Sequence, residues 1–263
     1  MDFIEIYSKQ SIIARTKKRH GETKLGEMVV TIQDPDNWQD ELKLLPQKFV
    51  IFGIPEDIGV RANYGRGGTH TAWKPSLDFL INMQSNQFLI GNEMLVLGHI
   101  NCDDLMEQAN LLNFKSDLDI KKARLLVEAV DERVINIVKS IVQSGKIPIV
   151  IGGGHNNAYP LIAACAQVNG LPINVINCDP HSDLRPRQGR HSGNGFHYAL
   201  HQQYLNKYAI FGMHESYNIN SAMQLIDSNP DRLMFVSYDD IFVRDYIQYF
   251  YGLKQSLDFV ENE

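Results

Sequence analysis

The sequence predicts an α/β fold, a three-layer α/β/α sandwich around a mostly parallel sheet, and three observations carry this prediction. Short, continuous apolar runs are typical of strands that are buried on both faces. Stretches with apolar residues at every third or fourth position separate several of these runs, as helices between strands do. Polar clusters with Gly, His and Asp follow two of the runs. Strands that alternate with helices imply right-handed parallel crossovers.

The apolar runs define the expected strands and the periodic stretches define the expected helices. The clearest helix covers residues 120–144, where Val130, Val134 and Val138 recur on one face and Gly145 ends the pattern. Further helices are expected at residues 75–83 and 158–168. The expected strands are residues 49–53, 94–98, 147–152, 173–178, 207–212 and 233–237.

Length and composition favour one folded domain. The chain has 263 residues, 44% of them hydrophobic, which is enough for one α/β domain with a large core. Residues 1–46 are mixed and polar, with a turn cluster at residues 34–37. We therefore expect an N-terminal extension over residues 1–46 that packs on an α/β domain over residues 47–263.

Charge and cysteine usage exclude several classes of protein. A net charge of −6 argues against a nucleic-acid-binding surface, which needs clustered Lys and Arg. The three cysteines, Cys102, Cys165 and Cys178, have neither metal-site nor disulfide-framework spacing. The N-terminus lacks the pattern of a secretory signal, and no apolar run is long enough to span a bilayer. We expect a reduced, cytoplasmic protein that binds neither nucleic acid nor membrane.

The apolar run at residues 173–178 leads directly into Asp179, His181 and Asp183. The chain is still extended at the carboxyl end of a buried strand, so alternate side chains point the same way and can converge. Carboxylate and imidazole together suit Mn²⁺, Fe²⁺ or Zn²⁺ better than Ca²⁺. A polar turn after the strand is the alternative, and it explains the Asp and Pro residues but not the His. The triplet predicts half of a metal site.

A second strand end carries a further candidate ligand. Residues 147–151 lead into three glycines and His155, followed by the helical stretch at 158–168. Ligands of open α/β sheets bind outside the carboxyl ends of strands, so we expect His155 to lie beside the Asp179–Asp183 triplet. A glycine loop that binds a dinucleotide is the alternative, but its third glycine would fall where this chain has Asn157.

Three blocks, in order, are similar to motifs of the ureohydrolases, the family of arginase, agmatinase and formimidoylglutamase. The first block is residues 52–68, and the second is Gly153-Gly154-His155, where Gly154 replaces the usual Asp of the family. The third is Asp179-Pro-His181-Ser-Asp183-Leu-Arg185, in which all ligand positions agree. The resemblance covers roughly residues 48–263 and implies an arginase-like fold.

The resemblance implies a centre with two Mn²⁺ ions. His155, Asp179 and Asp183 would hold one ion, and Asp179 would bridge to a second ion that His181 helps to hold. Two such cations acidify a shared water, which can attack the planar carbon of an amidinium or guanidinium group. The implied reaction is hydrolysis of a C–N bond in a small amidine or guanidine, and the implied protein can be a homo-oligomer.

The loop at residues 190–196 resembles the family's substrate-specificity loop, in which Ser and Asn meet the amino-acid end of the substrate. Arginases place a proton-carrying His two residues after this Asn, whereas this chain has Phe196 there and His197 one step later. This difference favours formimidoylglutamase, which releases formamide and glutamate in histidine breakdown. Arg185 can hold a substrate carboxylate through two parallel hydrogen bonds. The expected substrate-binding residues are Arg185, Ser192 and Asn194, and the expected catalytic residues are Asp183 and His197.

The family completes its metal centre with a later strand that ends Ser-x-Asp-x-Asp. The segment Ser237–Ile241 fits this pattern only at Ser237 and Asp239, and Asp239 lies much closer to Asp183 than the family places these ligands. We therefore expect a ureohydrolase-like chain that lacks the family's C-terminal part, with weak Mn²⁺ binding and little activity by itself.

Two alternatives to a formimidoylglutamase remain. An agmatinase- or arginase-type hydrolase that releases urea would use the same chemistry. A non-catalytic scaffold member of the family would keep the fold with an incomplete metal site, as Gly154 and the missing ligands allow.

Overall fold

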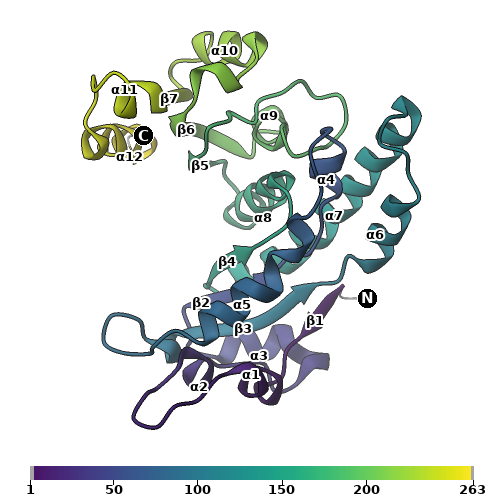
Figure 1. Ribbon diagram of the computed structural model, residues 1–263, viewed down its shortest axis with the longest axis vertical. Helices are drawn as coiled ribbons and strands as arrows, with labels where there is room; N and C mark the ends of the chain where they lie inside the picture. The colour runs from purple at the N-terminus through teal and green to yellow at the C-terminus, as the bar shows by residue number, and fades with distance from the viewer. Residues whose placement is uncertain (1–2, 262–263) are drawn as a thin grey trace.

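The chain is described over residues 3–261 in a computed structural model, whose strands form two sheets (Figure 1). The first sheet has the order β1-β3-β2-β4 and the second the order β5-β6-β7. All pairings are parallel except that of β1 with β3. The strands are β1 (Ile4–Ile6), β2 (Phe49–Gly53), β3 (Met94–Ile100), β4 (Ile147–Ile151), β5 (Ile173–Cys178), β6 (Leu205–Met213) and β7 (Leu233–Ser237).

The prediction of a mostly parallel α/β fold is confirmed, and each of the six predicted strands is present. The parallel strands nevertheless fall into two sheets, because β4 pairs only with β2 and β5 only with β6 within the described part of the chain. Helix α8 lies between the two sheets in Figure 1. The edges of β4 and β5 that face away from these partners are therefore free of strand pairing in residues 3–261.

The helices alternate with the strands as predicted. The long predicted helix is α7, which starts earlier than expected because the Ser116 side chain accepts a hydrogen bond from the backbone N–H of Asp119 and caps it. Gly145 follows its end with a φ of +71°, a left-handed conformation that glycine adopts without strain. The helices are α1 (Lys9–Arg15), α2 (Leu25–Met28), α3 (Trp38–Leu44), α4 (Ile58–Arg61), α5 (Trp73–Ile81), α6 (Asp103–Asn110), α7 (Asp117–Gln143), α8 (Ala158–Asn169), α9 (Gly195–His201), α10 (Asn220–Asp227), α11 (Tyr238–Phe242) and α12 (Tyr249–Glu261).

Alternation along the strands produces the layers of the first sheet. Val50 and Phe52 of β2 point into a core that contains the apolar face of α7. Ile51, between them, packs on the opposite face with Trp73 and Leu77 of α5. Successive side chains of a strand point to opposite faces, so a continuous apolar run needs helices on both sides.

The N-terminal residues join the first sheet. Strand β1 pairs antiparallel with β3, with Ile4 opposite Ile100. The Lys9 ammonium donates hydrogen bonds to the carbonyl oxygens of Gly26, Glu27 and Val29. Residues 4–44 thus pack on the sheet, and the boundary at residue 46 stays a prediction.

Helix α8 connects the cores of the two sheets. Its Ala164 belongs to the core of the first sheet, and its Ile162 and Ala163 belong to a second core with Tyr208 and Ile210 of β6. Helices α11 and α12 pack on the other face of β6 and β7. None of the described helices has both the length and the apolar character needed to cross a bilayer.

Candidate metal centre

A glycine turn after β4 carries His155. Gly152 and Gly153 have φ values of +90° and +76°. A Cβ atom on Gly153 would also lie 2.8 Å from the carbonyl oxygen of Ile54. The turn therefore requires glycine for both its conformation and its packing. It delivers His155 to the start of a short 3₁₀ helix, His155–Asn157, that leads into α8.

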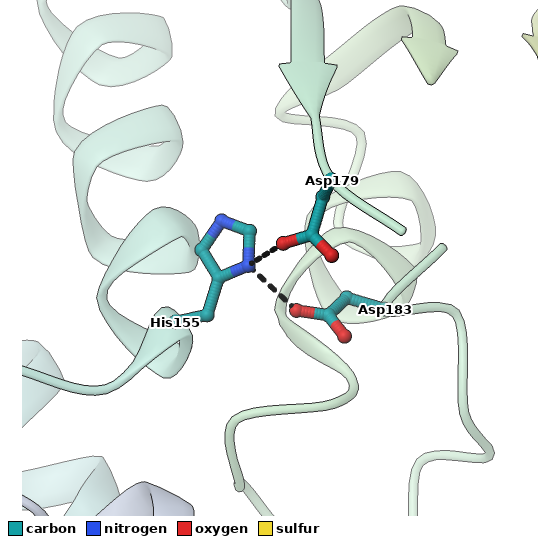
Figure 2. Close-up of side chains that lie close together, drawn as sticks. All are labelled: His155, Asp179 and Asp183. Carbon is teal, nitrogen blue, oxygen red and sulfur yellow. Dashed lines mark ion pairs between the residues drawn. The ribbon is translucent and has the colours of Figure 1, made fainter. Parts of the chain in front are cut away.

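His155, Asp179 and Asp183 converge on one point. The Nδ1 atom of His155 lies 3.1 Å from Asp179 Oδ2 and 2.8 Å from Asp183 Oδ2 (Figure 2). Their ligating atoms all lie within 4.8 Å of one another. Asp183 has a φ of +50°, a conformation uncommon outside glycine but tolerated by Asp. The ends of β4 and β5 thus bring one imidazole and two carboxylates together, as the sequence predicts.

The charges of this cluster support one another. Burial disfavours the charged form of His155, but hydrogen bonds and charges from Asp179 and Asp183 outweigh it and raise the pKa of His155 to about 10. For Asp179, burial by itself would raise the pKa. The hydrogen bonds from His155 and from the backbone N–H of His181 outweigh burial, so the pKa of Asp179 is lowered overall. A divalent cation can replace the proton between these groups, because imidazole and carboxylate suit Mn²⁺, Fe²⁺ or Zn²⁺.

His181 lies beside the cluster but is not part of it. Its Nδ1 is 3.3 Å from Asp179 Oδ1, and its backbone N–H donates to the same oxygen at 2.7 Å. The ring is half exposed and stacks on Tyr217, with the ring centroids 5.5 Å apart. Only His155, Asp179 and Asp183 form a cluster of three possible ligands within the residues that the structure describes.

A pocket of about 260 Å³ opens next to the cluster, and Arg185 and Ser192 line it with the four predicted ligands. Asn63 also lines the pocket, and its Nδ2 donates to Ser192 Oγ at 3.3 Å. The Arg185 guanidinium has no hydrogen-bond partner in residues 3–261, so its donors can face a ligand. Two of the three predicted substrate-binding residues thus lie at the pocket.

Asn194 and His197 lie elsewhere. Asn194 is fully buried, and its Oδ1 accepts hydrogen bonds from the Arg190 guanidinium and the backbone N–H of His191. His197 donates from Nδ1 to the carbonyl oxygen of Arg185 at 2.9 Å. Neither residue contributes to the wall that the described residues form around His155. Both side chains hold the loop between β5 and α9.

Asp239 also lies apart from the cluster. Its Oδ2 accepts a hydrogen bond from the backbone N–H of Glu215 and lies 3.7 Å from His214. Ser237, two residues earlier, caps α11. This segment serves as a strand end and helix start in the described structure.

Sequence reasoning missed two residues that support the site. Glu56 is completely buried beneath the glycine turn, and Arg190 is buried against Asp131 of α7. The sequence did contain a signal that a cation such as Arg190 would be buried. Asp131 lies on the apolar face of the predicted helix, four residues after Val127 and three before Val134. A carboxylate on such a face needs a cationic partner.

Fold and site together define an α/β protein with a candidate divalent-metal centre at the carboxyl ends of two parallel strands. The family model that matches this chain is described as the arginase family and covers residues 47–229. The chain belongs to the arginase family.

The curated relatives of this chain include formimidoylglutamases. The chain is 29% identical over 192 residues to the formimidoylglutamases of Salmonella newport (strain SL254) and Salmonella heidelberg (strain SL476), covering 70% of this chain and 51% of each relative. The chain thus spans about half the length of the curated relatives it matches.

Solved structures share the fold. Formimidoylglutamase from Bacillus subtilis has a TM-score of 0.66 and 15% identity, over 94% of this chain and 68% of that chain. Trypanosoma cruzi formiminoglutamase with Mn²⁺ has a TM-score of 0.64 and 20% identity, over 91% of this chain and 72% of that chain.

Proposed function

We propose that this chain belongs to a Mn²⁺-dependent amidine hydrolase that converts N-formimidoyl-L-glutamate to glutamate and formamide. The observation that carries the proposal is the convergence of His155, Asp179 and Asp183 beside a pocket that Arg185 lines, with a guanidinium that has no hydrogen-bond partner among the described residues. The curated relatives are named formimidoylglutamase, and three of the solved neighbours are described with Mn²⁺.

In this proposal, His155, Asp179 and Asp183 hold one ion, and Asp179 and His181 help to hold a second. The ions, when bound, supply positive charge that lowers the pKa of a water and favours charge development on the substrate. His155 must give up the proton on Nδ1 before that atom can be a ligand, since a ligating nitrogen is unprotonated.

The remaining pocket residues would position the substrate. Arg185 can bind a substrate carboxylate with its planar guanidinium. Ser192 Oγ, which accepts from Asn63, can turn its own O–H toward the amino-acid end. We assign Asn194 and His197 to holding the loop that carries Arg185 and Ser192, rather than to contacts with substrate or proton transfer.

A product assay on a small panel tests this proposal. Because little activity is expected of this chain by itself, the protein is assayed at high concentration with Mn²⁺ on N-formimidoyl-L-glutamate, arginine and agmatine, and formamide, glutamate and urea are measured. Formamide and glutamate without urea support the proposal, and urea supports the agmatinase or arginase alternative. A protein that binds no Mn²⁺ and turns over none of the three supports the scaffold alternative.

A further inference from the structure

Glu56 is a buried carboxylate without a cationic partner in the described residues. Its side chain is completely inaccessible to solvent, and none of the ion pairs in residues 3–261 includes it. It lies in the segment of residues 54–57 that connects β2 to α4. Burying a carboxylate costs free energy unless hydrogen-bond donors surround it. The donors around Glu56 therefore identify the parts of the chain that it holds in place.

Five N–H groups surround this carboxylate. Glu56 Oε2 accepts from the backbone of Ile58 at 2.8 Å and of Gly59 at 3.4 Å, at the start of α4. Glu56 Oε1 accepts from the backbone of Gly154 at 2.8 Å. It also accepts from the side-chain Nδ2 of Asn156 and Asn157, at 3.2 and 2.7 Å. Three of the five donors thus come from the residues on either side of His155.

Glu56 orients the side-chain amides of Asn156 and Asn157 so that, among the described residues, their N–H groups are bonded and their oxygens are not. Both Oδ1 atoms, of Asn156 and of Asn157, are buried without a hydrogen-bond partner in the described structure. A carboxylate only accepts hydrogen bonds, so each amide must turn its N–H group toward Glu56. The arrangement therefore favours the shape of the turn over complete satisfaction of its polar atoms.

The Asn156 side chain packs closely against two glycines. A Cβ atom on Gly154 would lie 2.3 Å from Asn156 Oδ1, and one on Gly59 would lie 2.0 Å from the same oxygen. Glycine at both positions makes room for the Asn156 side chain above the Glu56 carboxylate.

We propose that Glu56 is a positioning residue that fixes the glycine turn and thereby sets the affinity and geometry of the metal centre through His155. The inference rests on the proposed metal site but goes beyond it, since Glu56 contacts neither His155 nor a predicted ligand directly. Groups that orient metal ligands contribute to affinity without touching the ion.

The substitution Glu56→Gln tests the role of the carboxylate. Gln keeps the shape but presents an NH₂ group to donors, so the turn can no longer keep all five hydrogen bonds. We expect Mn²⁺ affinity to fall about tenfold or more, measured from the signal of free Mn²⁺ in electron paramagnetic resonance. The visible absorption spectrum of bound Co²⁺ should also change, because it reports ligand geometry.

Asp57→Asn is the matched control. Asp57 is also a buried carboxylate in the same segment, but it accepts from Gly68 and His70 instead of the glycine turn. Its substitution should leave Mn²⁺ affinity and the Co²⁺ spectrum as in the wild type. A loss of stability alone, with unchanged affinity and spectrum in Glu56→Gln, would overturn the positioning role.

A second variant keeps the inference testable if Glu56→Gln does not fold. Asn157→Leu removes one donor to Glu56 but keeps the size of the side chain, and weaker Mn²⁺ binding with an altered Co²⁺ spectrum is expected. Wild-type affinity in that variant contradicts the inference while leaving the proposed function intact. A wild-type protein that binds neither ion overturns the proposed function and, with it, this inference.

Discussion

The Arg190 guanidinium lies 2.7 Å from the carboxylate of Asp131, and both side chains are buried. Arg190 also donates to the carbonyl oxygen of Asn156, next to His155, and to Oδ1 of Asn194. Its guanidinium lies over the ring of Tyr159, 4.5 Å from the centroid. One side chain therefore connects α7, the glycine turn and the loop that lines the pocket.

Substitution Arg190→Met should destabilise the protein by about 3–5 kcal/mol, because it leaves Asp131 buried and unpaired. Urea unfolding followed by circular dichroism measures this change. Arg15→Met is the control, since Arg15 pairs with Asp78 at the surface and should contribute less than about 1 kcal/mol. Similar losses in the free energy of unfolding of the two variants would show that the buried ion pair contributes no more to stability than the surface pair.

Substitution Asp183→Asn should reduce Mn²⁺ affinity at least tenfold, roughly the effect of losing a supporting group of a metal site or more. The reason is that Asn offers a neutral ligand in place of a carboxylate. Asp239→Asn should leave affinity unchanged, because Asp239 lies outside the cluster. Calorimetric titration of both variants with Mn²⁺ shows which carboxylate binds the ion. Equal losses of affinity would contradict the assignment of Asp183 alone and indicate that Asp239 also contributes.

Substitution Arg185→Met should raise KM for N-formimidoyl-L-glutamate by roughly 10- to 100-fold, since a charged hydrogen bond contributes about 1.5–3 kcal/mol. Agmatine has no carboxylate, so its binding should not weaken. Arg187→Met is the control, because Arg187 is exposed and does not line the pocket. An equal loss for both substrates would assign Arg185 to the fold instead of to carboxylate recognition.

Acid should destabilise the protein through His191. Burial first, and then the charges of Arg124, Arg190 and Arg185, lower the pKa of His191 from 6.5 to about 3. Its Nδ1 accepts a hydrogen bond from the Gly193 backbone, as only an unprotonated nitrogen can.

The unfolded chain takes up a proton on His191 below about pH 6.5, whereas the folded chain does so only near pH 3. Stability present above pH 6.5 is therefore lost as pH falls toward 3, by up to about 1.4 kcal/mol per pH unit. His191→Asn should flatten this part of a stability profile measured by urea unfolding. His20→Asn, at an exposed position, should leave the slope unaltered.

Strand β2 was predictable from the sequence because its burial on both faces leaves a local signature. Val50, Ile51 and Phe52 face different layers, yet all are apolar, and this is visible without a structure. Strands β4 and β5 carry the same apolar pattern but are partly exposed in the described structure. The division into two sheets was not visible, since the pairing of β4 and β5 depends on contacts between distant segments. The boundary at residue 46 could not be placed for the same reason, as the pairing of Ile4 with Ile100 shows.

The positions of the candidate ligands were predictable because they follow strand ends. Asp179 and Asp183 follow β5 and His155 follows β4, and ligands of α/β proteins lie outside the carboxyl ends of parallel strands. The expected extended alternation of Asp179, His181 and Asp183 was wrong, since β5 ends at Cys178, Asp183 has a φ of +50° and His181 lies outside the cluster. The roles of Asn194 and Glu56 were not predictable, because each depends on which way a side chain turns within the folded loops. Asn194 turns inward to Arg190, and Glu56 turns beneath the glycine turn.

The three candidate ligands come from two different sheets. His155 follows β4 of the first sheet, whereas Asp179 and Asp183 follow β5 of the second, and no strand pairing joins these sheets in the described chain. A cation held there would bind residues from both sheets and so stabilise their placement relative to one another. Binding free energies are reciprocal, so a change that stabilises this placement of the two sheets would also raise the affinity for the ion.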